Sequence, residues 1–376
     1  MIPFCKTYVT GNEITYIEEV LRKGKVSGNG EFTQKCQHFF EARFSFKKCL
    51  LTSSCTDALE MAAILLNIKE GDEVIVPSYT FSATANAFVL RGARIIFADS
   101  SATNPNLDAS LLESLVSPRT KAIVVVHYGG MACDMDPIMD LAKKHNLFVV
   151  EDAAQAIDSY YKGRPLGSIG HLSTFSFHQT KNLTAGECGM LVVNDETMCE
   201  RAQIIWENGT NRAAFFRGEV DKYTWVGVGS AYLPSEITAA FLYAQLGFLD
   251  EIQKRRKEIW FTYQSAFSSL EREGKCRLPN IPDYATINGH LFYIICQSEA
   301  QRDEFITYLR ERGVYAVFHY NSLHKSPFQS DKHKGGQLVN SDKYSSCLVR
   351  LPLFFELDGS DLEKVIDTVK EYYLNK

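Results

Sequence analysis

A repeated alternation between short apolar runs and helix-like segments, from about residue 50 to residue 195, constrains the fold more than any other feature. The runs are rich in Val, Ile and Phe, and they lie at 73–77, 93–99, 121–128, 147–152, 173–177 and 189–195. Continuous apolar strands are typical of a parallel or mixed sheet that is covered by helices on both faces. This part of the chain is therefore predicted to form a large α/β domain.

One intervening segment has residues that are typical of the start and the end of a helix. A helix is expected at residues 137–146, with Asp136 as its N-cap, Pro137 as its first residue and Asn146 at its end. A crossover helix of this kind is what connects neighbouring parallel strands.

The pattern changes after about residue 234. A long helical stretch at 234–272 leads into a proline-containing linker. The order expected beyond it is a strand at 291–297, a helix at 300–313, a strand at 314–320 and a helix at 360–374. Residues 1–250 are predicted to form the large domain, which begins with a helical segment, and residues 251–376 a smaller C-terminal α+β domain.

Composition excludes several classes of function. The formal net charge is −5, so the chain lacks the excess of positive charge that is typical of nucleic-acid-binding proteins. No apolar run approaches the roughly 18–20 residues that a membrane span needs, and the N-terminus does not resemble a signal peptide. The ten cysteines form no CxxC pair and none lies near a histidine at metal-ligand spacing, which suits reduced thiols better than a metal site. We expect a cytoplasmic protein with no metal, nucleic-acid or membrane partner.

Polar residues follow several of the predicted strands directly. Asp152 closes an apolar run, where an unpaired carboxylate would be costly. Ser176 ends another run, and Lys181 comes five residues later. The hydroxyl-bearing segment 52–56 leads into an apolar helix, whose first N–H groups can bind an anion. Because strand ends in an open α/β sheet meet at one crevice, we expect these groups to lie together.

Each of these residues has an ordinary structural interpretation when it is taken alone. Asp152 can be a turn residue, Lys181 a solvated lysine, the segment 52–56 a simple N-cap, and Phe81 part of the core. Together they are the parts needed to hold pyridoxal phosphate (PLP), a cofactor that acts as an electron sink. An acid keeps the pyridine nitrogen protonated, and a lysine bonds to the aldehyde and moves protons. The combination favours a PLP enzyme.

Three segments resemble the DegT/DnrJ/EryC1/StrS family of sugar aminotransferases. They are GDEVIVPSYTFSATANAFVLRGARIIFAD, VVEDAAQA and GSIGHLSTFSFHQTKNLTAGECG, and the resemblance extends over nearly the whole chain. It implies a fold-type I PLP-dependent transferase, with a large mixed-sheet domain and a smaller C-terminal domain. It also implies a homodimer whose active sites are shared between the subunits.

The same resemblance assigns roles to individual residues. It places the Schiff-base lysine on Lys181, the acid at the pyridine nitrogen on Asp152, and the contact to the ring hydroxyl on Gln155. The remaining cofactor contacts are Ala154 and Phe81 on the two faces of the ring, with the Ser176 hydroxyl and the N–H groups of Cys55 and Thr56 at the phosphate.

The chain departs from the family pattern in two places. Many members carry Gly-x-Asn-x-Arg, whose Asn reaches the cofactor phosphate of the partner subunit, but here Ala231 and Leu233 occupy the polar positions. The nearby Arg212, Arg217 and Lys222 are candidate replacements for binding substrate or cofactor anions, the alternative being a solvated loop. In the second departure, the glycine-rich GEGG becomes Gly-Glu-Cys-Gly at 186–189.

The segments FFRGEVDKYTW and SSCTDALEMA resemble the branch of the family that makes dTDP-4-amino-4,6-dideoxygalactose. This implies transfer of an amino group from L-glutamate to C4 of a dTDP-4-keto-6-deoxyhexose, for O-antigen or lipopolysaccharide synthesis. C3 amination of a dTDP-3-keto-6-deoxyhexose and a non-catalytic binding protein on the same scaffold are the alternatives. Lys181 argues against a sugar 3-dehydratase, which has histidine there, and the absence of an early GxGxxG argues against a nicotinamide enzyme.

Overall fold

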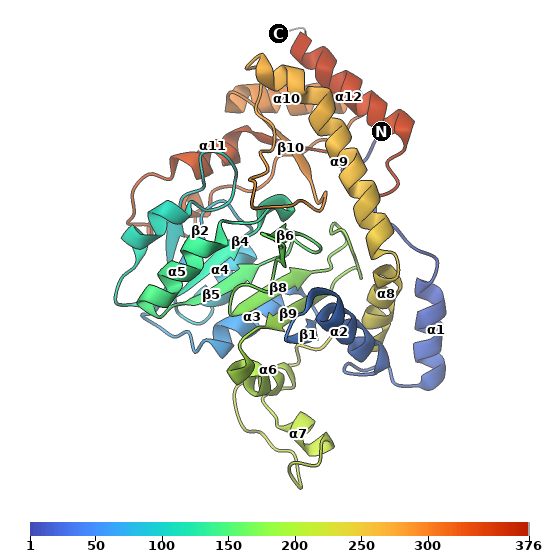
Figure 1. The fold of residues 1–376 in the computed structure, drawn as a ribbon, viewed down its shortest axis with the longest axis vertical. Helices are drawn as coiled ribbons and strands as arrows, with labels where there is room; N and C mark the ends of the chain where they lie inside the picture. The colour runs from blue at the N-terminus through green and yellow to red at the C-terminus, as the bar shows by residue number, and fades with distance from the viewer. Residues whose placement is uncertain (375–376) are drawn as a thin grey trace.

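The computed structural model describes residues 1–374, and a seven-stranded sheet lies at its centre (Figure 1). The strand order is β1-β9-β8-β5-β4-β2-β3. β9 runs antiparallel to both of its neighbours and the other pairs are parallel, so the sheet is mixed. The strands are β1 (Lys48–Thr52), β2 (Glu73–Pro77), β3 (Arg94–Ala98), β4 (Thr120–Val126), β5 (Phe148–Asp152), β8 (Leu172–Ser176) and β9 (Gly189–Val193). All six predicted runs are confirmed as strands, while β1 was not predicted.

The apolar runs form strands because both faces of the sheet are covered. On β4, Ala122 and Val124 pack towards one face, and Ile123 and Val125 towards the other, all fully buried. Burying one valine or isoleucine side chain contributes about 1.5–3 kcal/mol. The first face packs against α3 (Cys55–Leu65), α4 (Ser82–Val89) and α6 (Cys199–Trp206). The second packs against α2 (Glu31–Phe44), α5 (Met135–His145) and α8 (Glu236–Leu246).

The start of α5 differs from the prediction. The helix begins at Met135, so Asp136 lies in its first turn and is not the N-cap. The Asp136 carboxylate instead pairs with Lys162, with 2.6 Å between Oδ2 and Nζ. The predicted end at Asn146 is confirmed, since this residue adopts the left-handed conformation typical of a helix C-terminus.

A second hydrophobic cluster forms the small C-terminal part of the molecule. The predicted helical stretch breaks at Gly247, and α9 (Leu249–Arg272) then runs into this cluster. A two-stranded antiparallel sheet packs with it, together with three further helices: β10 (Phe292–Ile295), β11 (Leu348–Leu351), α10 (Glu299–Glu311), α11 (Val339–Cys347) and α12 (Gly359–Leu374). We propose residue 250 as the domain boundary, supported by the position at which α9 begins.

The predicted strand at 314–320 is wrong. Only single bridges are present, from Val314 to Ile2 and from Val317 to Arg350. The partner of β10 is β11, which was not predicted. The chain turns away after Val317 and carries His319 and Tyr320 to the site described below.

The remaining elements are mostly short. They are α1 (Glu13–Lys23), the hairpin β6 (Tyr160–Tyr161) and β7 (Arg164–Pro165), α7 (Arg212–Phe216), and four 3₁₀ turns at Ala109–Leu115, Tyr128–Gly130, Glu196–Met198 and Leu323–Lys325. The segment 208–231 around α7, which we call the arm, projects from the body of the molecule (Figure 1). Within the described residues, no helix is both long and apolar enough to cross a membrane.

Candidate active site

The pairing register of the sheet brings the ends of β4, β5, β8 and β1 to one edge. Val126 at the end of β4 pairs with Asp152 at the end of β5, and Asp152 pairs with Thr174 on β8. Ser176, the last residue of β8, pairs with Gly189 of β9, which also pairs with Thr52 at the end of β1. Because α3 starts just after β1, its N-terminus opens onto the same edge.

A cavity of about 730 Å³ lies at this edge, a size typical of small-molecule sites. All eight residues expected to contact the cofactor line it, namely Cys55, Thr56, Phe81, Asp152, Ala154, Gln155, Ser176 and Lys181. The fold thus brings together groups that are up to 126 positions apart in the sequence. Phe81 keeps 58% of its surface exposed, so its ring is available to a ligand.

The N-terminus of α3 forms an anion-binding cradle. Ser54 caps the helix by accepting the Asp57 N–H at 3.1 Å, and within the described residues the N–H groups of Cys55 and Thr56 have no acceptor. A Cβ on Gly189 would lie only 2.3 Å from the Cys55 nitrogen, so glycine is what allows β9 to pass this close. Cys188, the departure noted above, is buried beside it, and its thiol donates to the Thr52 carbonyl at 3.3 Å.

Asp152 is held in a defined orientation. It is 5% exposed, and it accepts hydrogen bonds from the Thr84 hydroxyl at 2.7 Å and the Ala154 N–H at 3.2 Å. Burial raises its pKa, and these hydrogen bonds and the Lys181 charge act in the opposite direction. A cation placed in the cavity would therefore find a buried carboxylate with few competing partners. Thr84, on α4, was not anticipated from the sequence.

Lys181 follows β8 in a tight turn, in which its N–H donates to the His178 carbonyl at 2.9 Å. Burial lowers the pKa of the Lys181 amine, and the nearby Arg350 acts in the same direction, whereas Cys55 and Asp152 oppose the shift. A lowered pKa increases the fraction of neutral amine, which is the form that attacks a carbonyl and accepts a proton.

The wall opposite the strand ends joins the predicted Gln155 to Tyr128, His319 and Tyr320, which were not predicted. Gln155 accepts the Gly129 N–H at 2.7 Å and donates to the Tyr320 hydroxyl at 2.9 Å. The His319 ring stacks on Tyr320 with 3.5 Å between centroids, and its Nδ1 lies 2.7 Å from the Tyr128 hydroxyl. The only signal in the sequence was a His-Tyr pair at the end of an apolar run.

A buried hydrogen-bonded pair of Glu151 and His127 supports β5 from behind. Glu151 lies 2.9 Å from His127 Nε2, and its carboxylate also accepts the N–H groups of Gly167, Ile169 and Gly170. Burial works to raise the pKa of Glu151, but the His127 ring and these backbone donors outweigh it and hold the pKa below its ordinary value. The pair fixes the loop after β7 next to Asp152.

The three cations expected at a shared site lie on the arm, outside this chain's own cavity. Arg217 is paired with Glu219 at 2.7 Å, and Arg212 packs over the Phe216 ring at 5.3 Å. Lys222 is exposed. The arm also exposes three large aromatic side chains, Trp225 (79%), Phe216 (70%) and Tyr223 (53%).

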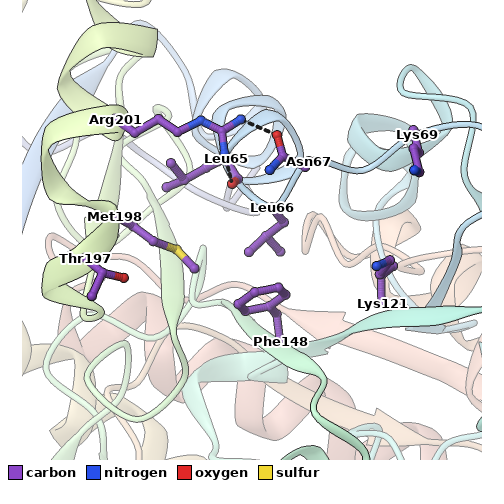
Figure 2. Close-up of a pocket in the computed structure, with 9 residues that line it drawn as sticks. All are labelled: Leu65, Leu66, Asn67, Lys69, Lys121, Phe148, Thr197, Met198 and Arg201. Carbon is purple, nitrogen blue, oxygen red and sulfur yellow. Dashed lines mark hydrogen bonds between the residues drawn. The ribbon is translucent and has the colours of Figure 1, made fainter.

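A second cavity, of about 410 Å³, lies elsewhere in the molecule (Figure 2). It is bounded by the C-terminal end of α3, the start of β5 and Met198. Arg201 there donates to the carbonyls of Ile64 and Leu65, and so closes the end of α3. Its lining includes no carboxylate or histidine, and none of the predicted site residues lies there.

The family model of the DegT/DnrJ/EryC1/StrS aminotransferase family matches residues 8–370. The chain belongs to this family. It is 35% identical over 379 residues to the spore coat polysaccharide biosynthesis protein SpsC of Bacillus subtilis, covering 98% of this chain and 96% of that protein. It is 32% identical over 379 residues to GDP-perosamine synthase of Escherichia coli O157:H7, covering 100% and 99% of the two chains.

Solved structures agree with this assignment. The PLP-form of the putative sugar aminotransferase Spr1654 from Streptococcus pneumoniae superposes with a TM-score of 0.90 at 26% identity, covering 100% of this chain and 99% of that one. The expected fold class and cofactor are confirmed, and the protein is a PLP-dependent sugar aminotransferase. The cavity of this aminotransferase fits the cofactor, because free helix N–H groups, a buried acid and a lysine of lowered pKa all line it.

Proposed function

We propose that this aminotransferase moves an amino group from L-glutamate to C4 of a dTDP-4-keto-6-deoxyhexose. The product would be a dTDP-4-amino-4,6-dideoxyhexose for O-antigen or lipopolysaccharide synthesis. The observation that carries the chemistry is the convergence of Lys181, Asp152 and the α3 N-terminus on one cavity.

Each cofactor contact has a role that its surroundings suit. PLP, when bound, supplies the electron sink that lets a proton leave a carbon next to nitrogen. Asp152 would hold the pyridine nitrogen in its protonated form, since the carboxylate is buried and oriented by Thr84. Gln155 would bind the ring hydroxyl. The N–H groups of Cys55 and Thr56 and the Ser176 hydroxyl would bind the phosphate, and Ala154 and Phe81 would hold the ring between them.

Lys181 is the residue that moves protons. It would hold the cofactor between turnovers, take the α-proton from glutamate in the first half-reaction, and return a proton to C4 of the sugar in the second. Its lowered pKa suits both steps, because a general base works best when its pKa lies near the working pH.

The substrate assignment rests on sequence similarity in the arm and on the relatives. The arm carries the segment FFRGEVDKYTW, which resembles the branch that handles this dTDP sugar. One relative is named for spore coat polysaccharide biosynthesis and another for synthesis of a GDP-linked sugar, which supports a nucleotide-sugar substrate for surface polysaccharide.

We extend the proposal to a cytoplasmic homodimer with shared active sites. Exposed aromatic side chains such as Trp225 and Phe216 are costly on a free surface and suit an interface. In the dimer, the arm would present Arg212, Arg217 or Lys222 to substrate or cofactor anions of the other subunit, where Ala231 and Leu233 cannot. The ten cysteines are all unpaired, which suits the reducing cytoplasm.

The test is to identify the product after incubation with ¹⁵N-glutamate. The panel contains a dTDP-4-keto-6-deoxyhexose, a dTDP-3-keto-6-deoxyhexose and a GDP-4-keto-6-deoxyhexose, and NMR locates the labelled nitrogen. We expect nitrogen on C4 of the dTDP-4-keto sugar, and none in the control with Lys181→Ala. Nitrogen at C3, or turnover of the GDP sugar alone, would refute the substrate assignment.

A further inference from the structure

The cavity of about 410 Å³ drawn in Figure 2 lies at the opposite edge of the sheet from the active site. Phe148 begins β5, whose last residue, Asp152, lines the active-site cavity, and Lys121 lies at the start of β4. Leu65 ends α3, whose first residue, Cys55, also lines the active-site cavity. Among the described residues the two cavities share no lining side chain, so each has room for a ligand of its own.

Two cations of this cavity have no partner. Within the part of the chain that the structure describes, the ammonium groups of Lys69 and Lys121 form no ion pair and no hydrogen bond, and both side chains are exposed. Figure 2 shows both on one side of Leu66, with Arg201 on the other. Arg201 donates to two carbonyls at the end of α3 and so offsets the negative end of the helix dipole, which would otherwise repel an anion. Because the lining contains no carboxylate, the local charge is positive and favours an anionic ligand.

The surface beside these cations is apolar. It consists of Leu66, Phe148 and Met198, which we call the apolar floor, and Figure 2 shows the three side chains pointing toward one another. Phe148 and Met198 are only half-buried, so part of the apolar floor is in contact with water. A bare phosphate ion would leave it so, whereas a ligand with a flat apolar ring would cover it. The thioether of Met198 also makes favourable contacts with aromatic rings.

Two polar side chains at the rim can bind the edge of such a ring. Asn67 accepts from Arg201 through Oδ1, and within the described residues its amide N–H groups have no acceptor. The Thr197 hydroxyl donates to the Asp195 carboxylate at 2.7 Å, which leaves its oxygen able to accept a hydrogen bond. A nucleobase has both carbonyl and N–H groups along its edge, so it can use a donor and an acceptor together. An acyl chain can use neither.

We propose that this cavity is a second ligand site, which binds a nucleoside diphosphate with its phosphates at Lys69 and Lys121 and its base on the apolar floor. A lysine ammonium is a compact charge that binds phosphate without a fixed geometry, which suits a pair of exposed lysines. The volume of about 410 Å³ lies in the range that is usual for small-molecule sites. The inference does not depend on which sugar the enzyme aminates, because no group of the proposed substrate enters this cavity.

The experiment uses a photoreactive nucleotide, because the proposed substrate is itself a nucleotide and binding alone would not separate the two cavities. The PLP-loaded protein is irradiated with 5-iodo-2′-deoxyuridine diphosphate, whose base attaches to an adjacent aromatic or sulfur-containing side chain. Peptide mass spectrometry then locates the adduct, and its yield is measured against the concentration of the probe.

The double variant Lys69→Gln, Lys121→Gln is compared with the matched control Lys143→Gln, Lys343→Gln. The control lysines are also exposed, and within the described residues their ammonium groups form no ion pair or hydrogen bond, but they do not line the cavity. Both double variants remove two positive charges, so a general effect of net charge would appear equally in both. The melting temperature of each variant is measured to confirm that it folds.

In the wild-type protein we expect an adduct on Phe148 or Met198, in addition to any adduct in the active-site cavity. Losing one exposed ammonium–phosphate contact should weaken binding about fivefold, so the double variant should raise the half-saturating concentration for this adduct about 25-fold. The control should stay within about twofold of wild type. An excess of dTDP should suppress the adduct, whereas the same concentration of inorganic phosphate, which has no base to cover the apolar floor, should not.

Three results would overturn the inference. Adducts confined to peptides of the active-site cavity, or no adduct at all, would show that no nucleotide binds at the far edge of the sheet. An adduct on Phe148 or Met198 that responds equally to both double variants would exclude the two lysines as the phosphate contacts. Suppression by inorganic phosphate as effective as that by dTDP would exclude a role for the base. The position of the wild-type adduct decides the first point even if a variant does not fold.

Discussion

Replacing Gly189 with alanine tests whether the N-terminus of α3 binds the cofactor phosphate. The added Cβ would lie 2.3 Å from the Cys55 nitrogen and 2.4 Å from the Ser54 carbonyl oxygen, where ordinary contacts begin at 3.4 Å. The obstructing atoms are all backbone, so β9 and the start of α3 must separate by about 1 Å. Overpacking of this kind costs about 1–3 kcal/mol in the free energy of unfolding.

The binding of PLP should be affected more strongly than the stability of the fold. A shift of this size removes the alignment of one or two N–H groups with the phosphate, at about 1.5–3 kcal/mol for each hydrogen bond to a charged group. We therefore expect the Kd of PLP to rise by at least tenfold, since every 1.4 kcal/mol is a factor of ten. The assay is titration of the apoprotein with PLP, followed by absorbance and by the quenching of tryptophan fluorescence.

The matched control is Gly359→Ala at the start of α12, where an added Cβ meets no heavy atom within 4 Å. It should bind PLP with the wild-type Kd. A Gly189→Ala variant that is destabilised as expected but binds PLP within twofold of wild type would show that the phosphate does not lie at this helix.

The other predictions concern four changes. Lys181→Ala should abolish turnover and leave the melting temperature nearly unchanged, because a cavity lysine contributes little to packing; activity in a variant of verified mass would contradict this. Asp152→Asn should lower the rate about a thousandfold or more while keeping the fold, as seen in kcat and in circular dichroism; an unchanged rate would make it a structural residue. Glu151→Gln should lower the free energy of unfolding by about 1.5–3 kcal/mol for each hydrogen bond to the carboxylate that the amide cannot replace. Since the folded pKa of Glu151 is held below 4.5, its stabilisation is present above that pH and lost as the pH falls through the folded pKa. Acid unfolding of the variant should therefore depend less steeply on pH than that of wild type, and equal steepness would exclude this role. Dimers that combine one Lys181→Ala subunit with one Lys222→Ala subunit should regain part of the activity that each homodimer lacks, and an active monomer at low concentration would refute shared sites.

Much of the large domain followed from the sequence because its strands are buried on both faces. Continuous runs rich in β-branched residues, such as 121–128, are typical of strands buried on both faces, and the structure confirms them. β1 was not predicted, because it starts with Lys48 and is followed directly by the polar segment before α3. The N-cap of α5 was placed two residues late, since Asp134 and Asp136 are equally suitable by local chemistry.

The small domain was harder because tertiary pairing decides its strands. The run 314–320 has strand-like composition, yet β11 is the segment that pairs with β10, and nothing local distinguishes the two. The site residues that this part of the chain contributes were therefore not predicted either. Asp152 and Lys181 could be found because strand ends meet at one edge, whereas His319, Tyr320 and Arg350 reach the cavity only once the small domain has folded over it.

The most direct test of the central claim is to reduce the purified, cofactor-loaded protein with borohydride and to locate the modified lysine by peptide mass spectrometry. The account predicts that the yellow colour disappears and that the reduced cofactor is found on Lys181 alone. A cofactor adduct on any other lysine, or bound cofactor that borohydride leaves unattached to the chain, would contradict it.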